Sequence, residues 1–225
     1  HGIGIGLIPD PPQIQFWGKY QPLLDHALGE CDTIKDKNLG KFCHSGSFHA
    51  VINYMMSRQY NFMIDRNDPF ALCFLQKEQY QKECFFQIAP QLPGLIHNNL
   101  PMILKLVKKI PDPYFENTAM LSLTNFTSQG NSIQEYLSFI TTCQNFDSSI
   151  SDACIPAVVM SIFKSGTPEL EYVNAVKLCS SNSLAQKYKL TCFQRLISIS
   201  RTIYDEKKME KVCGIVERQY QKLCE

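Results

Sequence analysis

Residues 167–197 read TPELEYVNAVKLCSSNSLAQKYKLTCFQRLI, and this stretch decides the fold. A cap residue ahead of proline, Thr167, is typical of a helix start, and apolar residues recur at helical spacing after Cys192. The pattern predicts one helix that ends near Cys179 and a second helix that carries Cys192 in its first turns. A disulfide between the two cysteines would then close the corner between the helices.

The same arrangement occurs five times, and it uses all ten cysteines of the chain. Within each pair, ten to twelve residues separate the two cysteines, so we predict only sequential disulfides. The predicted pairs are Cys31/Cys43, Cys73/Cys84, Cys143/Cys154, Cys179/Cys192 and Cys213/Cys224. Four residues before each second cysteine stands an apolar or aromatic residue that should pack into the corner: Leu39, Tyr80, Ile150, Tyr188 and Tyr220.

The second cysteines recur at steps of 32–41 residues, apart from one step of 70. Self-similarity at this period is typical of helical solenoids. We therefore predict an all-α fold of disulfide-stapled αα-hairpin repeats, a short solenoid-like array, with residues 23–225 as a single helical domain. The long step places one unit without a staple at about 85–142. Ser132 and Glu135 form a capping-box pattern at a helix start in this region.

This build resembles the cysteine-rich, disulfide-stapled αα-repeat proteins that bacteria secrete. The resemblance covers most of residues 23–225 and concerns architecture alone. The loops that the staples close are longer here, and the Gly/Ala repeat signature of that group is missing. It implies no functional residue for this chain.

Residues 1–22 differ from the rest and read HGIGIGLIPDPPQIQFWGKYQP. Alternating glycine followed by prolines disfavours helix and predicts an extended arm. Residues 1–16 are apolar but too rich in glycine and proline to fold alone, so they should be covered by something. We expect them to reach a neighbouring subunit or a protein partner, with packing along the chain's own helices as the alternative.

Composition excludes several classes of protein. Hydrophobic residues make up 44% of the chain, charged residues 19%, and the net charge is +1. These values exclude a disordered chain, and no basic block predicts nucleic-acid binding. No apolar run is long enough for a membrane span. The paired cysteines and a start at His1 without Met predict an extracellular or extracytoplasmic protein whose signal peptide has been removed.

Few residues stand out as candidates for chemistry. The α-amine and imidazole of His1 could chelate copper, which would make the chain a copper-handling protein. Glu169 with Glu171 is the closest pair of carboxylates at a helix start, and no catalytic motif is recognisable. We therefore predict no catalytic residue and no cofactor other than the possible copper. Asn125 begins an N-glycosylation sequon that is expected to lie in an exposed loop.

The leading hypothesis is a non-enzymatic exported helical-repeat protein that binds a macromolecular partner or packs in an extracellular assembly. Solenoid-like arrays form extended surfaces that suit this role. Copper handling through His1 is the first alternative. A hydrolase whose site is assembled from scattered residues is the second.

Overall fold

The structure, a computed structural model, describes residues 2–10, 12–127, 132–146 and 148–225. In these ranges the secondary structure is helical and contains no strand, which confirms the predicted all-α class. The chain divides into two compact units, residues 1–118 and 119–225. The single helical domain over residues 23–225 stays a prediction. Helix α8 (Asp112–Thr127) crosses the division between the two units.

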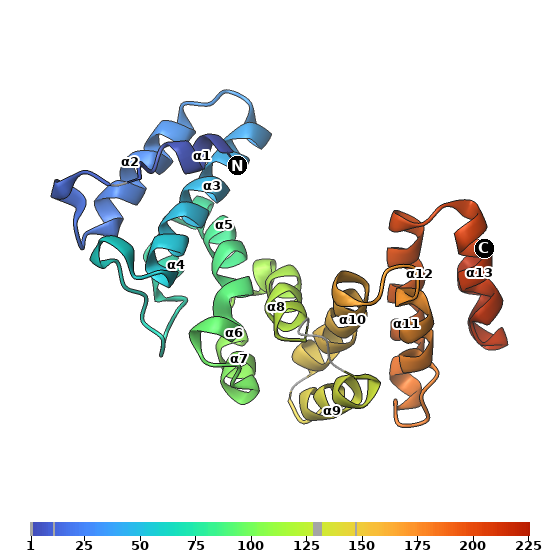
Figure 1. Cartoon of the computed structure of the whole chain (residues 1–225). Helices are drawn as coiled ribbons and strands as arrows, with labels where there is room; N and C mark the ends of the chain where they lie inside the picture. Colours follow the sequence, from blue (N-terminus) through green and yellow to red (C-terminus); the bar gives the residue numbers. More distant parts are fainter. Residues whose placement is uncertain (1, 11, 128–131, 147) are drawn as a thin grey trace. The chain divides into compact units, whose positions relative to one another are not determined.

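The first unit is organised around α3 (Lys37–Met56), which packs against α1, α2, α5 and η2. Its buried side chains include Phe48, Phe62 and Phe85. Figure 1 shows α1, α2 and α3 side by side at the N-terminal end of the chain. The other elements are α1 (Gly2–Gly6), η1 (Ile14–Phe16), α2 (Tyr20–Asp32), η2 (Gln59–Asn61), α4 (Ala71–Phe74), α5 (Glu78–Ile88), η3 (Ala89–Gln91), α6 (Leu92–Leu95) and α7 (Leu100–Val107).

The second unit is organised around α10 (Ser148–Ser165), which packs against α9, α11 and α12. The predicted capping box is present at the start of α9, where the Ser132 hydroxyl accepts from the Glu135 amide and the Glu135 carboxylate accepts from the Ser132 amide. The remaining elements are α9 (Ile133–Cys143), α11 (Glu171–Cys179), α12 (Gln186–Ile203), α13 (Glu206–Ile215) and η4 (Arg218–Cys224).

All five predicted cysteine pairs lie at disulfide distance. In every pair the first cysteine lies in the last turn of one helix and the second lies in the helix that follows. Of the residues expected to pack into the corners, Tyr80, Ile150 and Tyr220 are buried, Tyr188 is half-buried, and Leu39 is 51% exposed. The packing rule therefore fails at the first corner, where Leu39 lies at the solvent side of α3.

The predicted extended arm is wrong at its beginning. Residues Gly2–Gly6 form the short helix α1, which lies on α3 of the same chain. Gly4 makes this contact possible, because a Cβ atom there would lie 1.8 Å from the Cys43 carbonyl oxygen. Glycine's low helix propensity is overridden here by close packing of two backbones, which the absence of a side chain allows. Ile8, just beyond α1, is buried in the same unit.

Candidate functional site

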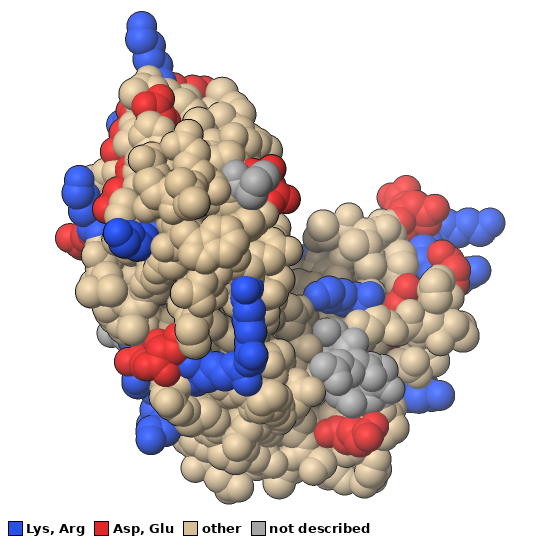
Figure 2. All heavy atoms as spheres, turned by 60° about the vertical axis from the view of Figure 1, so that its left-hand side comes forward, with Lys and Arg blue, Asp and Glu red and all other residues tan. Residues whose placement is uncertain are grey.

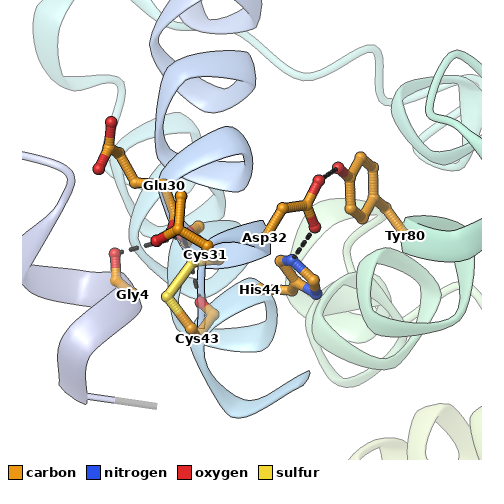
Figure 3. Close-up of a disulfide and its surroundings, with 9 residues drawn as sticks. Gly4, Glu30, Cys31, Asp32, Cys43, His44 and Tyr80 are labelled. Carbon is orange, nitrogen blue, oxygen red and sulfur yellow. Dashed lines mark hydrogen bonds and ion pairs between the residues drawn. A yellow bond between two sulfur atoms is a disulfide. The ribbon is translucent and has the colours of Figure 1, made fainter. Parts of the chain in front are cut away.

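A polar bridge runs beside the first disulfide. Asp32 and His44 directly follow Cys31 and Cys43, so they join the same two helices as the disulfide does (Figure 3). The His44 Nε2 atom lies 3.0 Å from Asp32 Oδ1. The His44 side chain is 13% exposed and the Asp32 side chain is 42% exposed. The carboxylate therefore keeps one side open to solvent while the histidine is largely enclosed.

Tyr80 connects this bridge to the next helical corner. Its hydroxyl donates a short hydrogen bond to Asp32 Oδ2, and its ring meets the His44 ring edge-on at 4.9 Å between centroids. Figure 3 shows the carboxylate of Asp32 between the two side chains. Burial, followed by the hydrogen bond to Asp32, raises the pKa of Tyr80. Tyr80 is the corner residue that precedes Cys84, so the first and second stapled corners are linked through one carboxylate.

This cluster fixes the Asp32 carboxylate between a histidine and a tyrosine. Both carboxylate oxygens of Asp32 already accept a hydrogen bond. In the parts of the chain that the structure describes, no hydroxyl or thiol group is hydrogen-bonded to His44. The nearby Ser47 hydroxyl instead bonds to the Gly4 and Cys43 carbonyl oxygens. The arrangement therefore stabilises the junction of three helices and presents a fixed carboxylate at its edge.

A second notable region of the first unit is an aromatic surface. Trp17 is 55% exposed, and its ring meets Tyr60 edge-on at 5.5 Å, while Tyr54 meets Tyr60 at 4.9 Å. The Gly18 amide donates to the Tyr60 carbonyl oxygen at 2.9 Å, which fixes this approach. Ile14 is 90% exposed in the same segment. Trp17, Tyr60, Ile14 and Met63 are together called the Trp17 surface below.

The turn that carries Tyr60 has an unusual backbone. Arg58, Tyr60 and Asn61 have φ values of 54°, 54° and 60°, in the left-handed region that side chains other than glycine rarely adopt. The Tyr60 hydroxyl donates to Asp10, and this bond, together with burial, raises the pKa of Tyr60 to about 12. Strained backbone of this kind is concentrated at functional sites.

A cavity of about 450 Å³ lies next to this turn. Three methionines contribute to its lining, and so do Arg58 and Arg66. The Arg66 guanidinium approaches His97 Nε2 at 3.3 Å. The lining residues are Met55, Met56, Arg58, Met63, Ile64, Asp65, Arg66, Gly94 and Leu95. This lining combines adaptable apolar side chains with an excess of positive charge.

In the second unit, the predicted carboxylate pair is divided between two partners. Glu169 forms an ion pair with Lys208, and Glu171 accepts a hydrogen bond from the Tyr204 hydroxyl at 2.9 Å. The Lys208 ammonium also lies over the rings of Tyr172 and Tyr204, 5.0 and 5.5 Å from their centroids. Burial, followed by the bond to Glu171, raises the pKa of Tyr204. Glu169 thus holds α13 to the turn before α11, and Glu171 holds α11 to the end of α12. Both carboxylates belong to one cluster around Tyr204 and Lys208.

The other predicted site residues are placed as follows. His1 lies outside the described residues. Asn125 lies in the last turn of α8 and not in a loop, and its Oδ1 accepts from the Lys164 ammonium at 2.7 Å. Thr127 of the same sequon is fully buried and bonds back to the Leu123 carbonyl oxygen. The helix continues through the sequon because the threonine packs inward, so the expectation of an exposed loop is wrong, while glycosylation stays a prediction.

Sequence reasoning missed the Asp32–Tyr80 link and the Trp17 surface. The position of Tyr80 before Cys84 was recognised, but its partner is 48 residues away and no local pattern names it. Over the described ranges, no group of three or more His, Cys, Asp or Glu side chains is placed to hold a metal ion. None of the helices described there is long and apolar enough to cross a membrane.

On the face of the molecule shown in Figure 2, Lys and Arg side chains are interspersed with Asp and Glu, with wide uncharged areas between them. Comparison with protein-family models, with curated proteins and with solved structures finds no match.

Proposed function

We propose that this chain is an exported helical-repeat protein that binds a protein partner through the Trp17 surface. Five local disulfides are typical of proteins that work in an oxidising compartment. The recurring unit would be the αα corner, in which each disulfide joins the end of one helix to the next helix. Such corners stabilise a thin array that has no single large core.

The observation that carries the proposal is the exposure of large apolar side chains on a fixed backbone. Trp17 is 55% exposed and Met63 is 72% exposed, although Trp17 is anchored to the strained turn at Tyr60. Tryptophan, tyrosine, methionine and arginine are the residue types enriched in protein interfaces and their energetic centres. A rigid aromatic surface loses little conformational freedom when a partner covers it.

The adjacent cavity indicates what the partner should present. Arg58 and Arg66 line it against one carboxylate, Asp65, whose Oδ1 already accepts from the Asn67 amide. Guanidinium groups pair readily with carboxylates, and methionine side chains adapt to apolar shapes. The expected partner therefore carries an aromatic or aliphatic side chain beside an Asp or Glu.

Selection of random peptides displayed on phage against the intact, oxidised protein tests this function. The proposal expects an enriched family that pairs an apolar residue with a carboxylate. Its binding should be lost in Trp17→Ala and in Arg58→Ala. The matched control is Leu190→Ala, because Leu190 is 48% exposed on α12 of the other unit. Enriched peptides that bind Trp17→Ala as tightly as the unchanged protein, or a selection with no enrichment, would contradict the proposal.

A further inference from the structure

We propose that a second cavity of the first unit, between α2 and the turn before α5, binds a small organic cation with an apolar body. The cavity measures about 600 Å³, within the range of small-molecule sites. It lies beside the Asp32–Tyr80 bond and does not include any residue of the Trp17 surface. The inference is therefore independent of the partner-binding function.

One wall of the cavity is a single face of α2. Asp25, Gly29 and Asp32 follow each other at four and three residues, which places them on one side of the helix. The two carboxyl-bearing positions are about 10 Å apart along the helix axis, from the rise per residue. Leu28, which is buried, lies behind this wall.

Gly29 leaves the backbone of α2 open at the cavity. It lies inside a helix, where glycine is about 1 kcal/mol less favourable than alanine. No atom of the protein lies within 4 Å of the Cβ that another residue would place there, so packing does not require glycine. The free space belongs to the cavity, where the missing side chain lets a bound molecule reach the helix backbone.

The charges around the cavity favour a cation. Asp25 and Asp32 contribute two carboxylates against one ammonium, from Lys77. Both carboxylates are already oriented by neutral or histidine donors: Gln21 Nε2 lies 2.8 Å from Asp25 Oδ1, and His44 and Tyr80 hold Asp32. A carboxylate oxygen accepts more than one hydrogen bond, so each can still receive an ammonium proton.

The opposite wall suits an apolar body. Leu75 is 72% exposed at the cavity, and the aromatic ring of Tyr80 lies beside the Asp32 carboxylate. An aromatic ring attracts a cation at its face and packs against hydrocarbon. An alkyl- or arylammonium ion therefore matches the cavity better than an anion or a neutral polar molecule does.

Isothermal titration of the oxidised, full-length protein with phenethylammonium tests the inference, with phenylpropionate as the anion of similar shape. Phenethylammonium should bind saturably, and phenylpropionate should bind at least about tenfold more weakly. Asp25→Asn keeps the shape of the side chain and should weaken phenethylammonium binding by about tenfold or more. Gly29→Phe should abolish binding, because no protein atom lies within 4 Å of the new Cβ and the ring would occupy the cavity that Gly29 lines.

The matched control for Gly29→Phe is Gly214→Phe, because Gly214 also lies in a helix with no atom near its Cβ position. That variant should bind phenethylammonium like the unchanged protein, and circular dichroism should show that all three variants keep their helices. Absence of saturable binding up to about 10 mM, equal binding of phenylpropionate, or undiminished binding by Gly29→Phe or Asp25→Asn would each overturn the inference.

Discussion

Replacing Gly4 by alanine should detach the N-terminal helix from α3. The new Cβ would lie 1.8 Å from the Cys43 carbonyl oxygen and 2.7 Å from the Ser47 amide nitrogen, both of them backbone atoms that cannot move aside. Residues 2–8 would then leave α3 and expose Ile8, which is 3% exposed in the folded protein. Loss of one buried isoleucine lowers the free energy of unfolding by about 2 kcal/mol.

The same substitution at Gly6 provides the control, since nothing lies within 4 Å of its Cβ position and its φ is not in the left-handed region. Alanine there should raise the free energy of unfolding by at most about 1 kcal/mol, because it restricts the unfolded chain. Urea denaturation followed by the fluorescence of Trp17, the only tryptophan of the chain, reports on the first unit. If Gly4→Ala and Gly6→Ala unfold at the same urea concentration, the docking of α1 on α3 is refuted.

Three further predictions concern the staples, the tyrosines and the unstapled stretch. The double substitution Cys143→Ala and Cys154→Ala removes one disulfide and should lower the free energy of unfolding by about 3 kcal/mol in the chain-entropy model. Urea denaturation measures this difference, and an unchanged transition would contradict the view that the disulfides stabilise the helical corners. The folded-state pKa values of Tyr60, Tyr80 and Tyr204 are raised, so the folded protein holds these phenol protons more tightly than the unfolded chain does. The contribution of these tyrosines to the free energy of unfolding should therefore be complete below about pH 10 and should fall as pH rises through the raised pKa values. Phenolate absorbance should show a group that titrates near pH 12 and disappears in Tyr60→Phe, and its persistence there would reject the assignment. Hydrogen exchange should be faster in η3, α6 and α7, which are short and unstapled, than in α12, and greater protection in the short helices would reverse this expectation.

The sequence predicted the corners well because each is a local feature. Cysteine spacing, helical periodicity and the Ser132 capping box all act between residues that are close in sequence, at most 13 positions apart for a cysteine pair. The structure has the helices and the sulfur pairs where these signals place them. The prediction of where α11 begins was less accurate. Thr167 was expected to cap it, but the chain first makes a turn with Glu169 at φ 71°, and the helix begins at Glu171.

The remaining features depend on contacts between distant residues. Helix α1 forms because Gly4 fits against α3, and no property of GIGIG by itself predicts that partner. The bond from Tyr80 to Asp32 and the contact of Trp17 with Tyr60 likewise join residues more than 40 positions apart.

The fluorescence of Trp17 in the presence of a selected peptide tests the central claim most directly. Because this residue is the only tryptophan and belongs to the Trp17 surface, every change in tryptophan emission comes from that surface. Saturating peptide should shift the emission to shorter wavelength and protect it from acrylamide quenching, as expected when an exposed indole becomes buried. A peptide that binds the protein while Trp17 emission and quenching stay unchanged would show that the partner binds elsewhere, and it would contradict the account.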